Sequence, residues 1–211
     1  MKHTSNETKI ILGIIITSIV LIIGAIAVFS KQETASQVSF TREELLPSET
    51  QKKGNASASA YLVEFSDFQC PACKAFQPLI SDIFSKYSDK LLFGYRHYPL
   101  PQHPFAEKAA YAAEAAGKQG KFWEYHDKLF AQNQDNFSDQ MFSDIAKELG
   151  LNEEQFNQDK ESSQIKEKVS NDHNAGNTFS VNATPTFYLN GEKLTLRSGQ
   201  DLLTAIEDVI K

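Results

Sequence analysis

The chain has very few cysteines: two among its 211 residues, Cys70 and Cys73, separated by Pro71 and Ala72. Small exported proteins that rely on disulfides for stability carry four or more cysteines at scattered spacings. Two cysteines in one C-x-x-C cannot link distant parts of a chain. A hydrophobic core must therefore stabilise the fold, and 41% hydrophobic residues suffice to build one. The two thiols are left free for chemistry.

Clustered positive charge is also absent from the sequence. The chain has 21 lysines and arginines against 27 acidic residues, which gives a net charge of −6 at pH 7. Neutralising the phosphates of a nucleic acid requires clustered Lys and Arg side chains. No long basic run occurs in the sequence. We therefore expect no nucleic-acid partner.

Charged residues are missing from residues 10–29, which read IILGIIITSIVLIIGAIAVF. Twenty helical residues span about 30 Å, the thickness of the hydrocarbon core of a bilayer. Because Lys2 and Lys9 precede the segment, it predicts a transmembrane anchor with residues 1–9 in the cytoplasm and the rest outside. The alternative is a signal peptide cleaved at the A-x-A pattern of residues 25–27, although signal peptides usually have a shorter apolar stretch. Both interpretations place the cysteines in a compartment where disulfides persist.

A polar segment, residues 30–59, follows the anchor and is interpreted as an extracytoplasmic linker. Within it, a short helix is expected near residues 41–46, ended by Pro47. The folded domain is expected at residues 60–211, because the first apolar, β-branched and aromatic run begins there.

Hydrophobic periodicity in this domain predicts an α/β fold. A strand at residues 61–65, an amphipathic helix from Pro71 and a second strand at residues 91–98 form a βαβ unit with a parallel pair of strands. A helical insert follows at about residues 101–178, which is too long for an ordinary connection and is expected to form a subdomain.

The end of the chain returns to β-structure. The dipeptide Asn190-Gly191 between two strand-like runs predicts a hairpin with a type I′ turn. A last amphipathic helix, with Leu202 and Ile206 facing inward, completes a ββα unit. The predicted order is βαβ, helical insert, ββα.

The C-x-x-C is located where the first strand passes into the helix. Unpaired backbone N–H groups and the helix dipole favour a thiolate at Cys70, and Cys73, one turn later, can resolve a mixed disulfide. Each unit by which the pKa of Cys70 is lowered stabilises the reduced state by about 1.4 kcal/mol, or about 30 mV for a two-electron couple. Pro71 and Ala72 offer the thiolate no side-chain donor. We therefore expect an oxidant that is milder than the strongest ones.

Two other uses of a C-x-x-C are disfavoured. A zinc site needs two more ligands, but the sequence has no third cysteine, and the four histidines after residue 90 are scattered. A purely structural disulfide would close a loop too small to stabilise much. We therefore expect redox catalysis, no metal, and no cofactor beyond a redox-active disulfide between Cys70 and Cys73.

Three stretches together resemble the DsbA-like thiol:disulfide oxidoreductases: VEFSDFQCPACKAF, RHYPLPQHPFAEKAAYAAEAAGKQGKFWEYHDKLF and VNATPTFYLNG. The resemblance covers roughly residues 50 to 211 and implies a thioredoxin fold with an inserted helical domain. It also implies that Cys70 is the nucleophile and Cys73 the resolving thiol. Pro185 would be a cis-proline beside them, and the backbone of Thr184 would pair with an incoming peptide.

One acidic residue, Glu64, stands six residues before Cys70 inside an apolar strand. It is either a solvent-facing strand residue or a buried acid, as the thioredoxin fold often carries at this position. A buried acid would have a raised pKa and relay the proton of Cys73.

Several other polar residues are expected to be structural. Trp123 and His126 share a helix face with large apolar side chains, which is typical of a core. His97 and His103 flank a proline-rich crossing into the insert, where a structural turn is expected. Asp67 is expected to be a turn or cap residue.

The leading hypothesis is a membrane-tethered oxidase that forms disulfides in reduced or unfolded exported proteins. The resemblance implies that a DsbB-type, quinone-linked membrane partner reoxidises it. A reductase or isomerase of the same fold stays open, because isomerase-type members also carry a threonine at the position of Thr184. A thioredoxin-like binding or chaperone module is the third possibility.

Overall fold

The computed structural model describes residues 15–19, which are helical, and residues 39–211. Within this described part of the chain, no helix is long and apolar enough to cross a membrane. The rest of the expected anchor at residues 10–29, and all of residues 1–9, lie outside the described residues.

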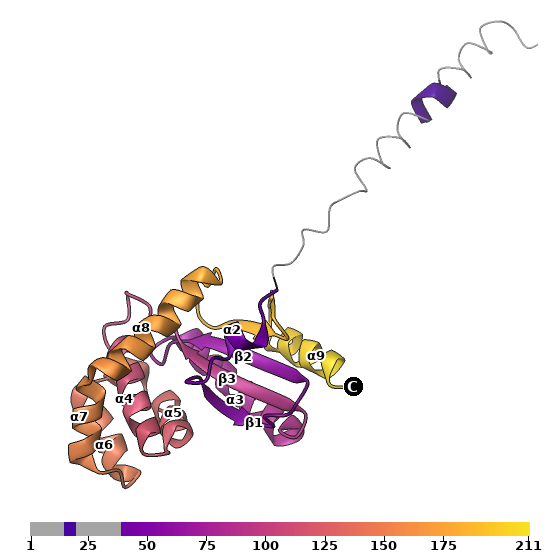
Figure 1. Ribbon diagram of the computed structural model, residues 1–211. Coiled ribbons are helices and arrows are strands. Elements are labelled where there is room, and N and C mark those ends of the chain that lie inside the picture. The colour runs from indigo at the N-terminus through magenta and orange to yellow at the C-terminus, as the bar shows by residue number, and fades with distance from the viewer. Residues whose placement is uncertain (1–14, 20–38) are drawn as a thin grey trace, which may run out of the picture. The chain divides into compact units, whose positions relative to one another are not determined.

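A five-stranded sheet forms the centre of the domain (Figure 1). Its strands run, from edge to edge, in the order β1 (Gln51–Gly54), β3 (Leu91–His97), β2 (Ala60–Ser66), β4 (Thr186–Leu189) and β5 (Glu192–Lys193). β2 and β3 are parallel, and the other neighbours are antiparallel. Every residue of β2 and β3 is buried, because other elements cover both faces of the sheet.

The predicted βαβ unit is confirmed, with α3 (Pro71–Tyr87) connecting β2 to β3. The predicted hairpin is also confirmed. Its turn has φ of 50° at Asn190 and 95° at Gly191, the positive values that a type I′ turn requires at both central residues. β5 is shorter than the sequence indicates. The N–H of Leu194 still donates to the carbonyl of Phe187 (2.9 Å), but Leu194 and Leu196 lie beyond the strand and pack against the core. The chain ends with α9 (Gly199–Val209), as expected.

The helical insert between β3 and β4 is confirmed as well. Figure 1 shows its helices gathered beside the sheet. One buried cluster runs from Leu62 and Phe93 in the sheet through Ala112 to Phe142 and Phe156 in the insert, so the two parts share a continuous core. The insert consists of α4 (Ala106–Lys118), α5 (Phe122–Ala131), the 3-10 helix η1 (Gln134–Asn136), α6 (Asp139–Glu148), α7 (Glu153–Glu161) and α8 (Ser163–Thr178).

The predicted start of the domain at residue 60 is wrong, because residues 39–59 already belong to the folded part. The short helix expected near residues 41–46 exists as α2 (Arg42–Leu45), and its Leu45 is buried against the second face of the sheet. β1 then pairs with β3 along four residues. The sequence of β1, QKKG, is polar because this is a half-buried edge strand, and polar edges do not show the alternation of a typical strand.

A buried ionic network joins the sheet to the insert. Glu114 of α4 is 4% exposed and accepts hydrogen bonds from Gln51 of β1 (2.8 Å) and from Lys168 of α8, and its Oε1 lies 2.8 Å from Nε2 of His97 of β3. Burial alone raises the pKa of Glu114. The His97 and Lys168 contacts outweigh that effect and lower the pKa to about 2.

We expect E114Q to lower the free energy of unfolding by on the order of 3 kcal/mol at pH 7, because Lys168 and His97 lose the carboxylate that they contact. Folding lowers the pKa of Glu114 from 4.5 to about 2. The contribution is therefore fully present above pH 4.5 and is lost as the pH falls toward 2. Urea denaturation at a series of pH values should show the parent and E114Q converging in acid. Glu107→Gln, at an exposed position of the same helix, is the control. A difference that does not change with pH would contradict this account.

Candidate active site

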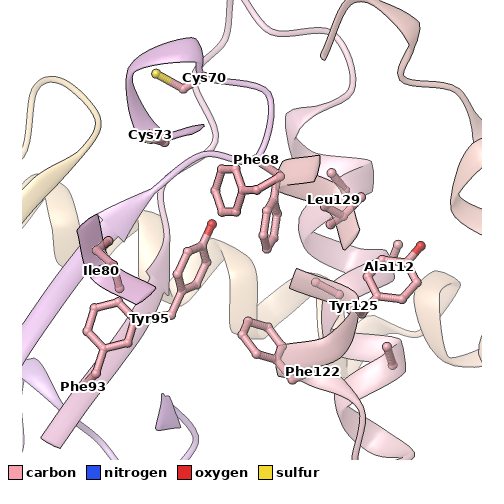
Figure 2. Close-up of a cluster of buried hydrophobic side chains, with 14 of the residues drawn as sticks. Phe68, Cys70, Cys73, Ile80, Phe93, Tyr95, Ala112, Phe122, Tyr125 and Leu129 are labelled. Atoms are coloured by element: carbon pink, nitrogen blue, oxygen red, sulfur yellow. The ribbon is translucent and has the colours of Figure 1, made fainter. Parts of the chain in front are cut away.

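Cys70 stands at the N-terminal end of α3, as the N-cap residue in an extended conformation, with Pro71 in the first turn. Its N–H donates to the Asp67 carbonyl (3.0 Å), and its own carbonyl accepts the N–H of Lys74 (3.1 Å). Both cysteines are free thiols, and Cys73 is fully buried whereas Cys70 is 6% exposed. Figure 2 shows them at one end of the core, with the hydroxyl of Tyr95 pointing toward that end.

The predicted acidity of Cys70 agrees with the geometry. A hydrogen bond from the Cys73 thiol is the main cause that lowers the pKa of Cys70, to about 5, against the opposing effect of burial. The hydroxyl of Thr184 and the backbone N–H groups of Cys73 and Ala72 contribute in the same direction. The helix N-terminus therefore acts as the sequence predicts, but the second cysteine contributes more.

The two thiols have opposite acidities. Burial raises the pKa of Cys73 well above its usual value, and the hydrogen bond to Cys70 and the charge of Glu64 act in the same direction. At neutral pH the reduced site thus holds one thiolate, on Cys70, and one thiol, on Cys73. This is the charge state of a pair in which Cys70 exchanges with substrates and Cys73 is retained inside.

Thr184 and Pro185 lie beside Cys70, and the peptide bond between them is cis, as the resemblance implies. The Cys70 thiol donates to the Thr184 carbonyl (3.4 Å). A thiolate can only accept, and the buried Thr184 hydroxyl, which has no other partner among the described residues, is in place to donate to it.

Glu64 is fully buried, so its interpretation as a solvent-facing residue is wrong. Burial raises its pKa to about 7, although the Ser66 hydroxyl, which donates to Oε1 at 2.7 Å, and the charge of Lys53 favour the carboxylate. The other oxygen, Oε2, is buried without a hydrogen-bond partner among the described residues. An acid with this pKa can both give and take a proton near pH 7.

Lys53 is a site residue that sequence reasoning missed. Its ammonium lies over the ring of Trp123, 4.4 Å from the centroid, and burial lowers its pKa against the charges of Asp127 and Glu64. It lines a cleft of about 410 Å³ between α3 and α5, together with Gln77 and Asp127. Lys53 belongs to the segment that was interpreted as a linker, so no pattern in the neighbouring sequence indicated that it lies near Glu64.

The residues expected to be structural are confirmed as such. His126 is fully buried in an aromatic cluster, and Trp123 donates from its ring N–H to the carbonyl of Lys52 (3.1 Å). Asp67 accepts the backbone N–H groups of Gln69 (2.7 Å) and Leu100 (2.9 Å) and contacts Nδ1 of His103 (2.7 Å). These bonds shape the turn before Cys70. Among the described residues, no three His, Cys, Asp or Glu side chains cluster closely enough to hold a metal ion.

The thioredoxin family matches residues 48–208 of the sequence. Among curated proteins, the chain is 38% identical over 151 residues to the Na⁺/H⁺ antiporter NhaA 1 of Mycolicibacterium gilvum (strain PYR-GCK), a match that covers 70% of this chain. The chain spans only 24% of the length of that relative.

Solved structures show the same fold. The thiol-disulfide exchange protein alpha-DsbA2 of Wolbachia pipientis superposes with a TM-score of 0.71 at 22% identity, over 79% of this chain and 90% of that one. Oxidised BdbD of Bacillus subtilis superposes with a TM-score of 0.70 at 22% identity, over 82% of this chain and 97% of that one. The predicted thioredoxin-like fold with an all-helical insert is thereby confirmed.

Absorbance of the thiolate at 240 nm should show Cys70 titrating near pH 5, and T184V should move the midpoint to about pH 6. Valine has no hydroxyl, and a hydrogen bond to a charged group is worth about 1.5–3 kcal/mol, of which the lower end corresponds to about one pKa unit. Thr184→Ser keeps the hydroxyl and should titrate like the parent. Identical midpoints for T184V and the parent would show that the hydroxyl does not reach the thiolate.

Proposed function

The chain belongs to the thioredoxin family, and from that premise we propose that it is a thiol:disulfide oxidoreductase that forms disulfides in other proteins. The observation that carries the proposal is the split acidity of the two thiols, with the pKa of Cys70 lowered to about 5 and that of Cys73 raised. A stable Cys70 thiolate stabilises the reduced protein. The disulfide form is then an oxidant.

The reaction begins with the Cys70–Cys73 disulfide. A substrate thiolate attacks Sγ of Cys70, the disulfide breaks, and the Cys73 sulfur leaves as a thiolate that takes up a proton. The second substrate thiol, once deprotonated, attacks the substrate sulfur of the mixed disulfide, and Cys70 leaves as a thiolate. The substrate loses two electrons and gains a disulfide, and the protein gains the two electrons as a dithiol.

Glu64 is proposed to supply the proton to Cys73 and to take it back when the protein is reoxidised. Cys73 is fully buried, so its proton must come from a neighbouring group, and the charge of Glu64 acts directly on its pKa. Lys53 and Gln77, which both favour the charged form of the Glu64 carboxyl, line the cleft between α3 and α5, and we propose that protons reach Glu64 from this cleft.

Substrate peptides are proposed to bind beside Thr184 and Pro185, the residues next to the Cys70 sulfur. We propose reduced or unfolded exported proteins as substrates, and an oxidising membrane partner of the quinone-linked, DsbB type. Both proposals extend the resemblance described above. The redox-active disulfide is the only cofactor that this chemistry requires.

The N-terminal segment supports a proposal about where the protein is located. We propose that residues 10–29 anchor the chain as a single span, with residues 1–9 in the cytoplasm and the catalytic domain outside. Secretion after cleavage of a signal peptide would place the domain in the same compartment. The 151-residue match to part of a protein named as a Na⁺/H⁺ antiporter supports a role beside a membrane, but ion transport stays a property of that much longer protein.

The oxidised full chain should convert a reduced two-cysteine test protein to its disulfide form, as followed by alkylation and mass shift. C70S should abolish the conversion because the attacked sulfur is missing. E64Q should slow it by about 10²-fold, the lower range for loss of a general acid. E64Q should also lose the inflection near pH 7 that the pKa of Glu64 gives the parent.

Glu43→Gln, at an exposed position of α2, is the matched control and should behave like the parent. Conversion by C70S at the parent rate would refute oxidation through these cysteines and favour a binding or chaperone module. An unchanged pH profile in E64Q would remove Glu64 from the reaction.

A further inference from the structure

The helical insert contacts the backbone of the active-site loop directly. Gln134 stands in η1, between α5 and α6, and its side-chain amide reaches across to the residues before α3. Nε2 donates to the carbonyl of Phe68 (2.8 Å) and to the carbonyl of Cys70 (2.9 Å). Gln134 is 8% exposed, so both hydrogens of this amide are used in a protected setting.

The contact is reciprocal. Gln69, in the active-site loop, donates from Nε2 to the carbonyl of Gln134 (3.3 Å) and accepts the N–H of Phe105 on Oε1 (2.8 Å). Lys74, one residue after Cys73, donates its ammonium to the carbonyl of Gln132. Two segments of the insert, one before α4 and one after α5, therefore hold the loop.

We propose that Gln134 is a positioning residue for Cys70, through which the helical insert sets the redox potential of the pair. The biological role of this residue rests on the proposed function. The redox potential and the acidity of the thiol do not, because both are properties of the isolated protein. It assigns a function to the insert beyond covering the sheet.

The physical reason lies at the Cys70 carbonyl. This oxygen accepts two hydrogen bonds, one from the N–H of Lys74 and one from Gln134, so its negative end is neutralised from both sides. An uncompensated carbonyl dipole on the same residue would repel a thiolate. The same bond fixes the position of the N-cap residue, and so keeps the Cys70 sulfur within reach of the Cys73 thiol and the Thr184 hydroxyl.

The test replaces Gln134 by methionine, which has a similar length and no donor. Q134M should raise the pKa of Cys70 by about one, measured as thiolate absorbance at 240 nm in the full chain. The equilibrium constant with reduced and oxidised glutathione should shift about tenfold toward the oxidised protein, which corresponds to about 30 mV. Q134E, measured at a pH where its carboxyl is ionised, should shift both quantities further, since a carboxylate cannot donate and adds a negative charge beside the carbonyls.

Gln132→Met is the matched control. It lies in the same loop, its side chain is half-buried, and only its backbone carbonyl contacts Lys74. It should keep the pKa and the glutathione equilibrium of the parent.

A purely structural role would give a different result. Q134M and Q134E would then melt at a lower temperature while the pKa of Cys70 and the glutathione equilibrium stayed at the parent values, and this outcome would overturn the proposal. If Q134M does not fold, Q134E decides by the same two measurements. Neither the pKa of Cys70 nor the glutathione equilibrium is measured with a client protein. If the protein failed to oxidise clients, the conclusion about Gln134 would therefore still be valid.

Discussion

The hydrogen bond from the Cys73 thiol to the Cys70 sulfur is the interaction on which the rest of the site depends. It works because the two sulfurs differ in environment although they are three residues apart. Cys73 faces the core and is fully buried, so its proton stays on. Cys70 caps the helix, where N–H groups, the Thr184 hydroxyl and that retained proton stabilise a negative charge. Reduction of the pair therefore ends in a stable thiolate.

The surrounding fold maintains this difference from two sides. The sheet holds Glu64 where its charge acts on Cys73, and the edge strand β1 adds the partly buried charge of Lys53, which acts on the Glu64 carboxyl. The insert holds the active-site loop through the hydrogen bonds of Gln134, and the buried carboxylate of Glu114 connects the insert to the sheet. The insert and the sheet share one hydrophobic core, which includes both cysteines. A substitution in the insert can therefore alter the environment of the cysteines although the substituted residue does not contact them.

Local sequence patterns were enough to predict most of the fold and the reactive residues of the candidate active site. The apolar run of β2, the periodicity of α3 and the Asn190-Gly191 turn each report on their own backbone, so the βαβ and ββα units could be read directly. The start of the domain could not be predicted from local sequence, because β1 is stabilised by pairing with β3 and by the aromatic rings around Lys53. The contacts of Gln134 depend on two segments more than 60 residues apart and leave no local signal.

Whether the stabilised Cys70 thiolate makes this protein an oxidant is measured most directly by the reduction potential of the Cys70–Cys73 pair. The full chain would be equilibrated in glutathione buffers and the free thiols counted by alkylation. We expect a potential of about −120 to −200 mV, the range of disulfide-forming proteins. A potential of about −270 mV, as found in thioredoxin, would show that the protein is a reductant instead.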